Sequence, residues 1–161
     1  MSDVLCMYYS RTGKTREAAK EIAAALDAEA VEITDGVDYG GAGGFLRAGR
    51  SAMARTTAPL APYQTQRPLH EYRLVILATP VWAGRCASPI RGLLKRRGLE
   101  MERVAYVLTR ASGKHYEEVY EQMDLYTAAP HVLAVSLRPG DTGYAFWRDG
   151  FVQDVKRYLE K

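Results

Sequence analysis

Residues 4–15 read VLCMYYSRTGKT, and this stretch decides the fold. The run 4–9 is short and almost continuously apolar, which is typical of a strand that is buried on both faces of a parallel sheet. Residues 15–26 then show apolar positions at helical spacing, with Ile22 among them. A strand, a loop of hydroxyl-bearing and basic residues, and a helix therefore follow one another, as in a βαβ unit.

The same alternation continues along the chain. Further strands are predicted at 30–33, 74–78, 104–108 and 131–137, and further helices from Ser88-Pro89, over 116–125 and over 144–159. Ser followed by Pro is a favoured cap and first-turn pair. Strands that alternate with helices predict right-handed crossovers and an α/β fold. We expect a three-layer, doubly wound sheet of five parallel strands in the order 2-1-3-4-5.

A segment at about 34–68 interrupts this rhythm. It opens with glycines, suggests a helix over 45–55 and ends in a proline-rich stretch. A loop of this length in a compact domain is usually functional. A solvated helix covering the sheet edge is one interpretation; an anion-binding roof built by Arg47, Arg50 and Arg55 is the other. We expect residues 1–161 to form a single domain that carries this segment as an insertion.

Composition excludes several classes of protein. The formal net charge of +3 is too small to predict nucleic-acid binding, and no apolar stretch approaches the roughly 18 residues of a membrane span. Residues 1–4 carry no basic leader, so a cytoplasmic location is expected. Cys6 and Cys86 do not suggest a disulfide framework, and the three histidines lack metal-ligand spacing. No catalytic residue and no metal ligand is predicted.

The loop Ser10–Thr15 predicts a phosphate site. Three hydroxyls and a glycine stand directly before a helix, whose N-terminus offers N–H donors and partial positive charge. A simple helix cap would explain one hydroxyl but not three. A Walker A loop would need glycine where Tyr8 stands. The spacing from Cys6 to Arg11 is one residue short of a cysteine-phosphatase loop, and no dinucleotide-binding GxGxxG is present.

The stretch 79–85, which reads TPVWAGR, follows the third predicted strand. Its Trp82 lies at the strand end, on the same edge of the sheet as the phosphate loop. A large aromatic side chain there would be poorly buried unless a flat group covered it. The alternative is a tryptophan that packs against a helix.

These loops together resemble the flavodoxin family. The pattern Ser10-x-Thr12-Gly13-x-Thr15 looks like its phosphate loop, and 79–84 looks like its first flavin loop. Residues 109–113, which read TRASG, fall where that family places its second flavin loop. The resemblance spans essentially the whole chain and implies non-covalently bound flavin mononucleotide (FMN). The cofactor-binding residues that it implies are Ser10, Arg11, Thr12, Gly13, Lys14, Thr15, Thr79, Pro80, Val81, Trp82, Ala83, Gly84, Thr109, Ala111, Ser112 and Gly113.

The resemblance also implies roles for these residues. The hydroxyls and backbone of the first loop would hold the phosphate, and residues 79–80 would line the ribityl chain. Trp82 would stack on the isoalloxazine, with the Ala83–Gly84 backbone near its N5 atom. Backbone N–H groups of 111–113 would reach the pyrimidine edge. Tyr116 is either a second aromatic wall or a helix residue that faces solvent.

Two functions are compatible with this resemblance. The first is an electron carrier between redox partner proteins, favoured because Trp82 on the outer ring face would block hydride donors. The second is an NAD(P)H-dependent oxidoreductase of quinones or other small acceptors. Basic residues favour the second, since Lys14 stands where the family often has Asn and the second flavin loop contains Arg110 and Lys114. The oligomeric state is not predicted.

Overall fold

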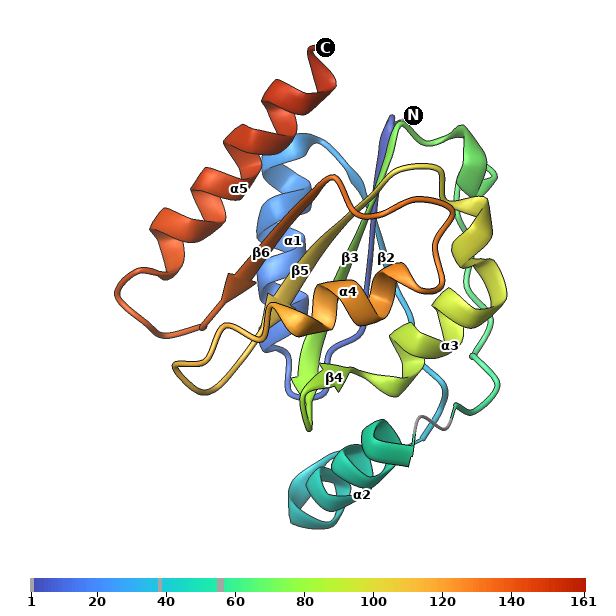
Figure 1. Ribbon diagram of the computed structural model, residues 1–161, viewed down its shortest axis with the longest axis vertical. Helices are drawn as coiled ribbons and strands as arrows, with labels where there is room; N and C mark the ends of the chain where they lie inside the picture. The colour runs from blue at the N-terminus through green and yellow to red at the C-terminus, as the bar shows by residue number, and fades with distance from the viewer. Residues whose placement is uncertain (1, 38, 55–56) are drawn as a thin grey trace.

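The computed structural model describes residues 2–37, 39–54 and 57–161 (Figure 1). Its strands are β1 (Val4–Tyr8), β2 (Glu29–Glu32), β3 (Leu74–Trp82), β4 (Arg85–Cys86), β5 (Val104–Thr109) and β6 (Leu133–Leu137). Five of them form a parallel sheet in the order β2-β1-β3-β5-β6, and β4 pairs antiparallel with the end of β3. Counted along the chain, the five parallel strands have the predicted order 2-1-3-4-5, so that prediction is confirmed.

The helices form the two outer layers. They are α1 (Lys14–Leu26), α2 (Gly41–Ala54), α3 (Ser88–Arg97), α4 (Glu118–Asp124) and α5 (Tyr144–Leu159), with short 3-10 helices at Leu69–Glu71 and Gly98–Glu100. Helices α1 and α5 cover one face of the sheet, and α3 and α4 cover the other. Helix α2 lies beyond the carboxyl ends of the strands (Figure 1).

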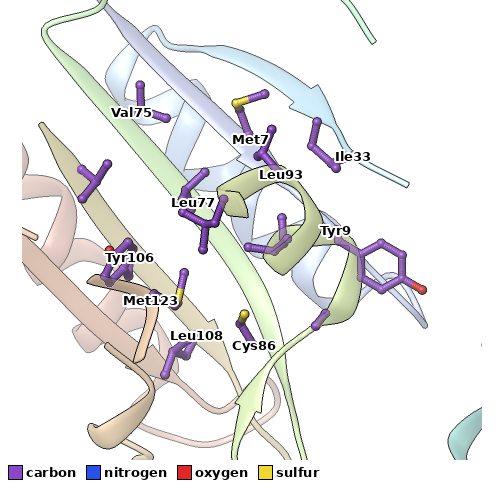
Figure 2. Packing of buried hydrophobic residues seen from close by; sticks show 14 of the residues in the cluster. Met7, Tyr9, Ile33, Val75, Leu77, Cys86, Leu93, Tyr106, Leu108 and Met123 are labelled. Carbon is purple, nitrogen blue, oxygen red and sulfur yellow. The ribbon is translucent and has the colours of Figure 1, made fainter. Parts of the chain in front are cut away.

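Each face of the sheet carries its own hydrophobic cluster. Along β1, Cys6 packs with the α1 and α5 side, whereas Met7 belongs to the α3 and α4 side. Figure 2 shows Met7 in the second cluster with Leu93 of α3 and Met123 of α4. Because successive strand residues point to opposite faces, burial on both faces requires the near-continuous apolar runs seen in the sequence.

The structure corrects several predicted boundaries. β3 continues to Trp82 and turns back as β4, a hairpin that the sequence did not indicate. Ala87, not Ser88, occupies the cap position of α3. The helix predicted over 116–125 begins only at Glu118, because Tyr116 has a left-handed backbone with φ 60°. Helix α2 starts earlier than expected, and Arg55 lies outside the described residues.

Both cysteines are free and buried. Burial raises the pKa of the Cys6 thiol to about 12 and that of Cys86 to about 11, the nearby Arg91 opposing the second shift. Both side chains therefore remain protonated thiols at neutral pH. Among the described helices, none combines the length and the apolar character needed to cross a membrane.

A polar network closes the core under α4. Asp124 accepts hydrogen bonds from the Tyr106 hydroxyl at 2.7 Å and from the His131 backbone N–H at 3.0 Å. Its other carboxylate oxygen lies 2.8 Å from His131 Nδ1. Burial, together with the bond to Asp124, raises the pKa of the Tyr106 phenol well above its ordinary value. One carboxylate thus joins α4 to β5 and to the segment that enters β6.

We expect Asp124→Ala to destabilise the fold by about 3 kcal/mol, because it leaves the buried Tyr106 hydroxyl and the His131 donors without their acceptor. For a domain of this size, Tm should fall by roughly 6–12 °C. Thermal unfolding followed by circular dichroism measures this shift. Glu121→Ala, an exposed carboxylate on the same helix, is the control and should change Tm little. A small loss for Asp124→Ala would show that the network does not hold α4 in place.

Candidate functional site

Three neighbouring parallel strands deliver three loops to one edge of the sheet. In β1 and β3, Tyr8 is paired in register with Ala78, and in β3 and β5, Pro80 is paired with Thr109. The Tyr9 backbone N–H extends the first pairing by donating to the Ala78 carbonyl at 3.2 Å. The loops that begin after these strands therefore lie side by side, at the edge where open α/β sheets bind ligands.

The first loop turns into α1 at Gly13, which has φ 100° and ψ −13°. This left-handed conformation is strained for residues with a Cβ. The backbone therefore favours glycine at position 13, and the missing side chain also leaves room for a ligand to approach closely. The Ser10 hydroxyl accepts a hydrogen bond from the Gly13 N–H at 2.9 Å and so closes the loop. The helix that begins at Lys14 directs its first N–H groups toward this loop, which suits an anion.

The three hydroxyls predicted in this loop have different surroundings. Ser10 braces the loop, and Thr12 is exposed to solvent. Thr15 is only 2% exposed, and its hydroxyl lies 2.6 Å from that of Thr109 at the end of β5. This bond joins the first loop to the predicted second flavin loop and fixes their spacing.

Arg11 links the first loop to the 34–68 segment. Its Nη1 donates to the Tyr39 carbonyl at 3.2 Å, and its guanidinium lies 5.5 Å from the centre of the Phe45 ring. A polar cavity of about 220 Å³ beside the loop is lined by Arg11, Ser10 and Glu32, among others. The cation predicted to face a phosphate thus also holds the insertion against the site.

The predicted first flavin loop is a tight hairpin. Ala83 and Gly84 form its two-residue turn, with φ of 50° and 75°, the combination of a type I′ turn. Thr79 is fully buried, and its hydroxyl accepts from the Ala87 N–H and donates to the Pro80 carbonyl, both at 2.9 Å. Its side chain shapes the turn, so any contact with a ligand here comes from its neighbours.

Trp82 is covered by an aromatic residue that the sequence did not reveal. The indole is 6% exposed, and the Tyr39 ring lies against it at 4.7 Å between centroids, tilted by 55°. Tyr9 makes an edge contact with the same indole at 5.4 Å. The expected flat cover over Trp82 is therefore supplied by the insertion. No periodicity in 34–68 marks Tyr39, so sequence alone gave no signal for it.

The predicted second flavin loop is open. Ala111, Ser112 and Gly113 are exposed. Arg110 donates from Nη1 to the Ser112 carbonyl at 2.6 Å and from Nε to the Ser136 hydroxyl at 2.9 Å. Arg110 therefore braces the loop against β6. The Tyr116 hydroxyl lies 3.2 Å from the Ser112 hydroxyl, so this tyrosine stands beside the loop, outside α4.

The chain is similar to known proteins in structure, and not detectably in sequence. No protein-family model matches the sequence, and no curated protein sequence matches it. A solved candidate flavoprotein from Bacteroides uniformis is 22% identical, with a TM-score of 0.73 over 96% of this chain and 98% of that one. A flavoprotein from Lactobacillus acidophilus, solved in complex with FMN, is also 22% identical, with a TM-score of 0.66 over 91% and 99%.

A flavodoxin from the domain Archaea is 13% identical, with a TM-score of 0.61 over the whole of both chains. A flavodoxin, WrbA-like protein from Agrobacterium tumefaciens is 11% identical, with a TM-score of 0.56 over 98% and 99%. These identities are low, but the matches cover nearly all of each chain. The chain therefore has the flavodoxin-like α/β fold.

Proposed function

We propose that the chain is a single-domain redox protein that binds FMN at the carboxyl edge of its sheet. The observation that carries this proposal is the left-handed Gly13 turn into α1, placed next to the Trp82 hairpin by the pairing of β1 with β3. The proposed residues of the cofactor site are Ser10, Arg11, Thr12, Gly13, Lys14, Thr15, Thr79, Pro80, Val81, Trp82, Ala83, Gly84, Thr109, Ala111, Ser112 and Gly113. Among them, Thr15, Thr79 and Thr109 would act by positioning the loops, because their hydroxyls are buried and bonded internally.

The phosphate end of the site fits this group well. The loop that leads into the N-terminus of α1 carries the exposed Thr12 hydroxyl and two basic residues, Arg11 and Lys14. Hydrogen bonds from charged donors to a phosphate are stronger than those between neutral groups. Thr15 acts indirectly, since its buried hydroxyl sets the distance to Thr109.

The ring end fits only after a movement. Tyr39 is 5% exposed and lies where a flat ring would contact the outer face of Trp82. Its hydroxyl donates to Asp35 at 3.2 Å, and burial together with that carboxylate raises its pKa, so the phenol stays neutral. We infer that Tyr39 moves aside, or shifts to cover the ring, when the cofactor binds.

FMN, when bound, supplies the electron-accepting chemistry, and the chain supplies binding and surroundings. We favour an electron carrier, because α2 presents apolar side chains beside the site. Phe45, Leu46 and Met53 are 64%, 69% and 70% exposed, on a helix that also carries Arg47 and Arg50. Exposed apolar groups with a charged rim are typical of a protein-docking surface.

An NAD(P)H-dependent oxidoreductase of small acceptors is the second candidate. It is supported by the basic groups near the edge, among them Arg11, Arg47 and Arg50, which could receive the phosphates of a dinucleotide. In this case the same α2 would form the roof over the nicotinamide.

We expect the purified protein to bind FMN with Kd below about 10 µM, and riboflavin more weakly, because only FMN carries the phosphate. Lys14→Gln should weaken FMN binding about fivefold, by the loss of about 1 kcal/mol, and leave riboflavin binding unchanged. Quenching of flavin fluorescence measures both affinities. Lys20→Gln, an exposed lysine later in α1, is the matched control. Equal affinity for FMN and riboflavin would contradict a phosphate site in this loop.

We expect Tyr39→Ala to raise the affinity for FMN and for riboflavin alike, by about 2- to 10-fold, since an aromatic pair contributes about 0.5–1.5 kcal/mol beyond area. Titration of each flavin by fluorescence measures the change. Tyr63→Ala, another tyrosine of the same segment, serves as the control. Weaker flavin binding by Tyr39→Ala would show instead that this ring packs on the cofactor.

The two functions differ in their direct reaction with NADPH. We expect NADPH or NADH, mixed anaerobically with the FMN-loaded protein, to leave the visible flavin absorption unchanged for minutes. Addition of a separate flavodoxin reductase should then bleach it. Stopped-flow absorbance separates the cases, and rapid bleaching by NADPH alone would assign the oxidoreductase function.

A further inference from the structure

A second cavity lies at the β6 edge of the sheet. It has a volume of about 420 Å³ and is lined by residues of β6, of α5, and of α4 with the segment that precedes it. Its described lining includes Tyr120, Ala134 and Phe151, and none of the proposed FMN-binding residues. It is therefore a separate feature of the molecule, in the size range of small-molecule sites.

Five of its eleven described lining residues carry rings: His115, Tyr120, Phe146, Trp147 and Phe151. Phe146 and Trp147 are 74% and 50% exposed, although both stand on a helix whose buried face is already filled. The His115 and Trp147 rings meet edge-on at 6.3 Å, and Phe146 meets Trp147 at 5.8 Å with an angle of 83° between the planes. Tyr120 completes the wall from α4. The face of an aromatic ring carries negative electrostatic potential.

Glu117 and Asp154 line the cavity, and no Lys or Arg is among its described lining residues. Arg110 stands behind the wall, where its Nε donates to the Ser136 hydroxyl at 2.9 Å and its Nη2 lies 3.5 Å from His115 Nε2. Asp154 pairs with Arg157 at 3.3 Å, but that guanidinium side chain is 74% exposed, and such exposed pairs are weak. This carboxylate pair stands out on a chain whose formal net charge is +3.

Gly150, an exposed residue of α5, lines the cavity without a side chain. A Cβ added there would meet nothing within 4 Å and would project into open space beside α5. A purely apolar ligand would cover the carboxylates of Glu117 and Asp154 without supplying a positive charge to pair with them, and such burial costs free energy. A positive charge on a flat body would pair with the carboxylates and lie against the faces of the rings.

We propose that this cavity binds a flat organic cation, that is, an aromatic ring system of one or two rings that carries a permanent positive charge. The aromatic walls select the flat body, and Glu117 and Asp154 select the charge. The proposal does not depend on FMN binding, since the cavity and the flavin loops share no described residue.

The test uses three probes with nearly the same bicyclic body and different charge: 1-methylquinolinium, quinoline and naphthalene-2-sulfonate, at pH 7.5. Equilibrium dialysis against the full chain, with and without FMN, gives each affinity. We expect 1-methylquinolinium to bind with Kd below about 1 mM, about fivefold or more tighter than quinoline, with the sulfonate weakest. No binding of any probe at millimolar concentration, or a preference for the sulfonate, would overturn the proposal.

Gly150→Leu fills the cavity while leaving the helix intact, because leucine has the higher helix propensity. It should weaken binding of the cation at least tenfold and leave FMN affinity unchanged. Gly49→Leu is the matched control, since an added Cβ in α2 also meets nothing within 4 Å. Glu117→Gln and Asp154→Asn should each lower cation affinity toward that of quinoline.

Two further results would count against the site. Unchanged cation binding by Gly150→Leu would place the probe elsewhere on the surface. Sedimentation that shows a dimer, dissociated by Phe146→Ser, would assign this face to a second copy of the chain. Either result overturns the small-molecule proposal without bearing on the flavin site.

Discussion

The parallel pairing of β1, β3 and β5 is the constraint on which the candidate flavin site depends. Each strand is buried on both faces, so its position in the sheet is fixed by two hydrophobic clusters at once. The loops that leave these strands have no comparable packing of their own. They obtain their spacing from the strand register and from a few links, among them the pair of hydroxyls of Thr15 and Thr109 and the contact of Tyr9 with Trp82. A shift of any one strand would separate the residues that the proposed function needs together.

The sequence predicted what depends on local pattern and on general rules of chain topology. The strands followed from apolar runs, and the strand order from five strands that alternate with helices in a doubly wound fold. It did not predict what depends on tertiary contacts. Tyr39 reaches Trp82 because α2 is docked on α3 by the Ser51–Ser88 hydroxyl pair and by Arg91, whose Nη2 lies 3.5 Å from a carbonyl of α2. A threonine hydroxyl that binds a ligand also looks the same in sequence as the internally bonded one of Thr79.

The small net charge conceals an uneven local distribution of charge. Arg11 and Lys14 belong to the first loop, whereas Glu117 and Asp154 line the cavity beside β6. Arg110 lies between the two, because it follows β5 and donates to Ser136 of the cavity wall. A summed charge describes solubility and long-range attraction and says nothing about such local arrangements.

The tight start of α2 has a mechanical consequence. A Cβ at Gly44 would lie 2.1 Å from the Tyr39 carbonyl carbon, so the helix and the tyrosine backbone are in direct contact with no side chain between them. A displacement of the Tyr39 backbone toward Gly44 would push on the first turn of α2, which directly precedes the exposed Phe45 and Leu46. The exposed apolar surface of α2 is thereby coupled to whether Tyr39 covers the indole of Trp82.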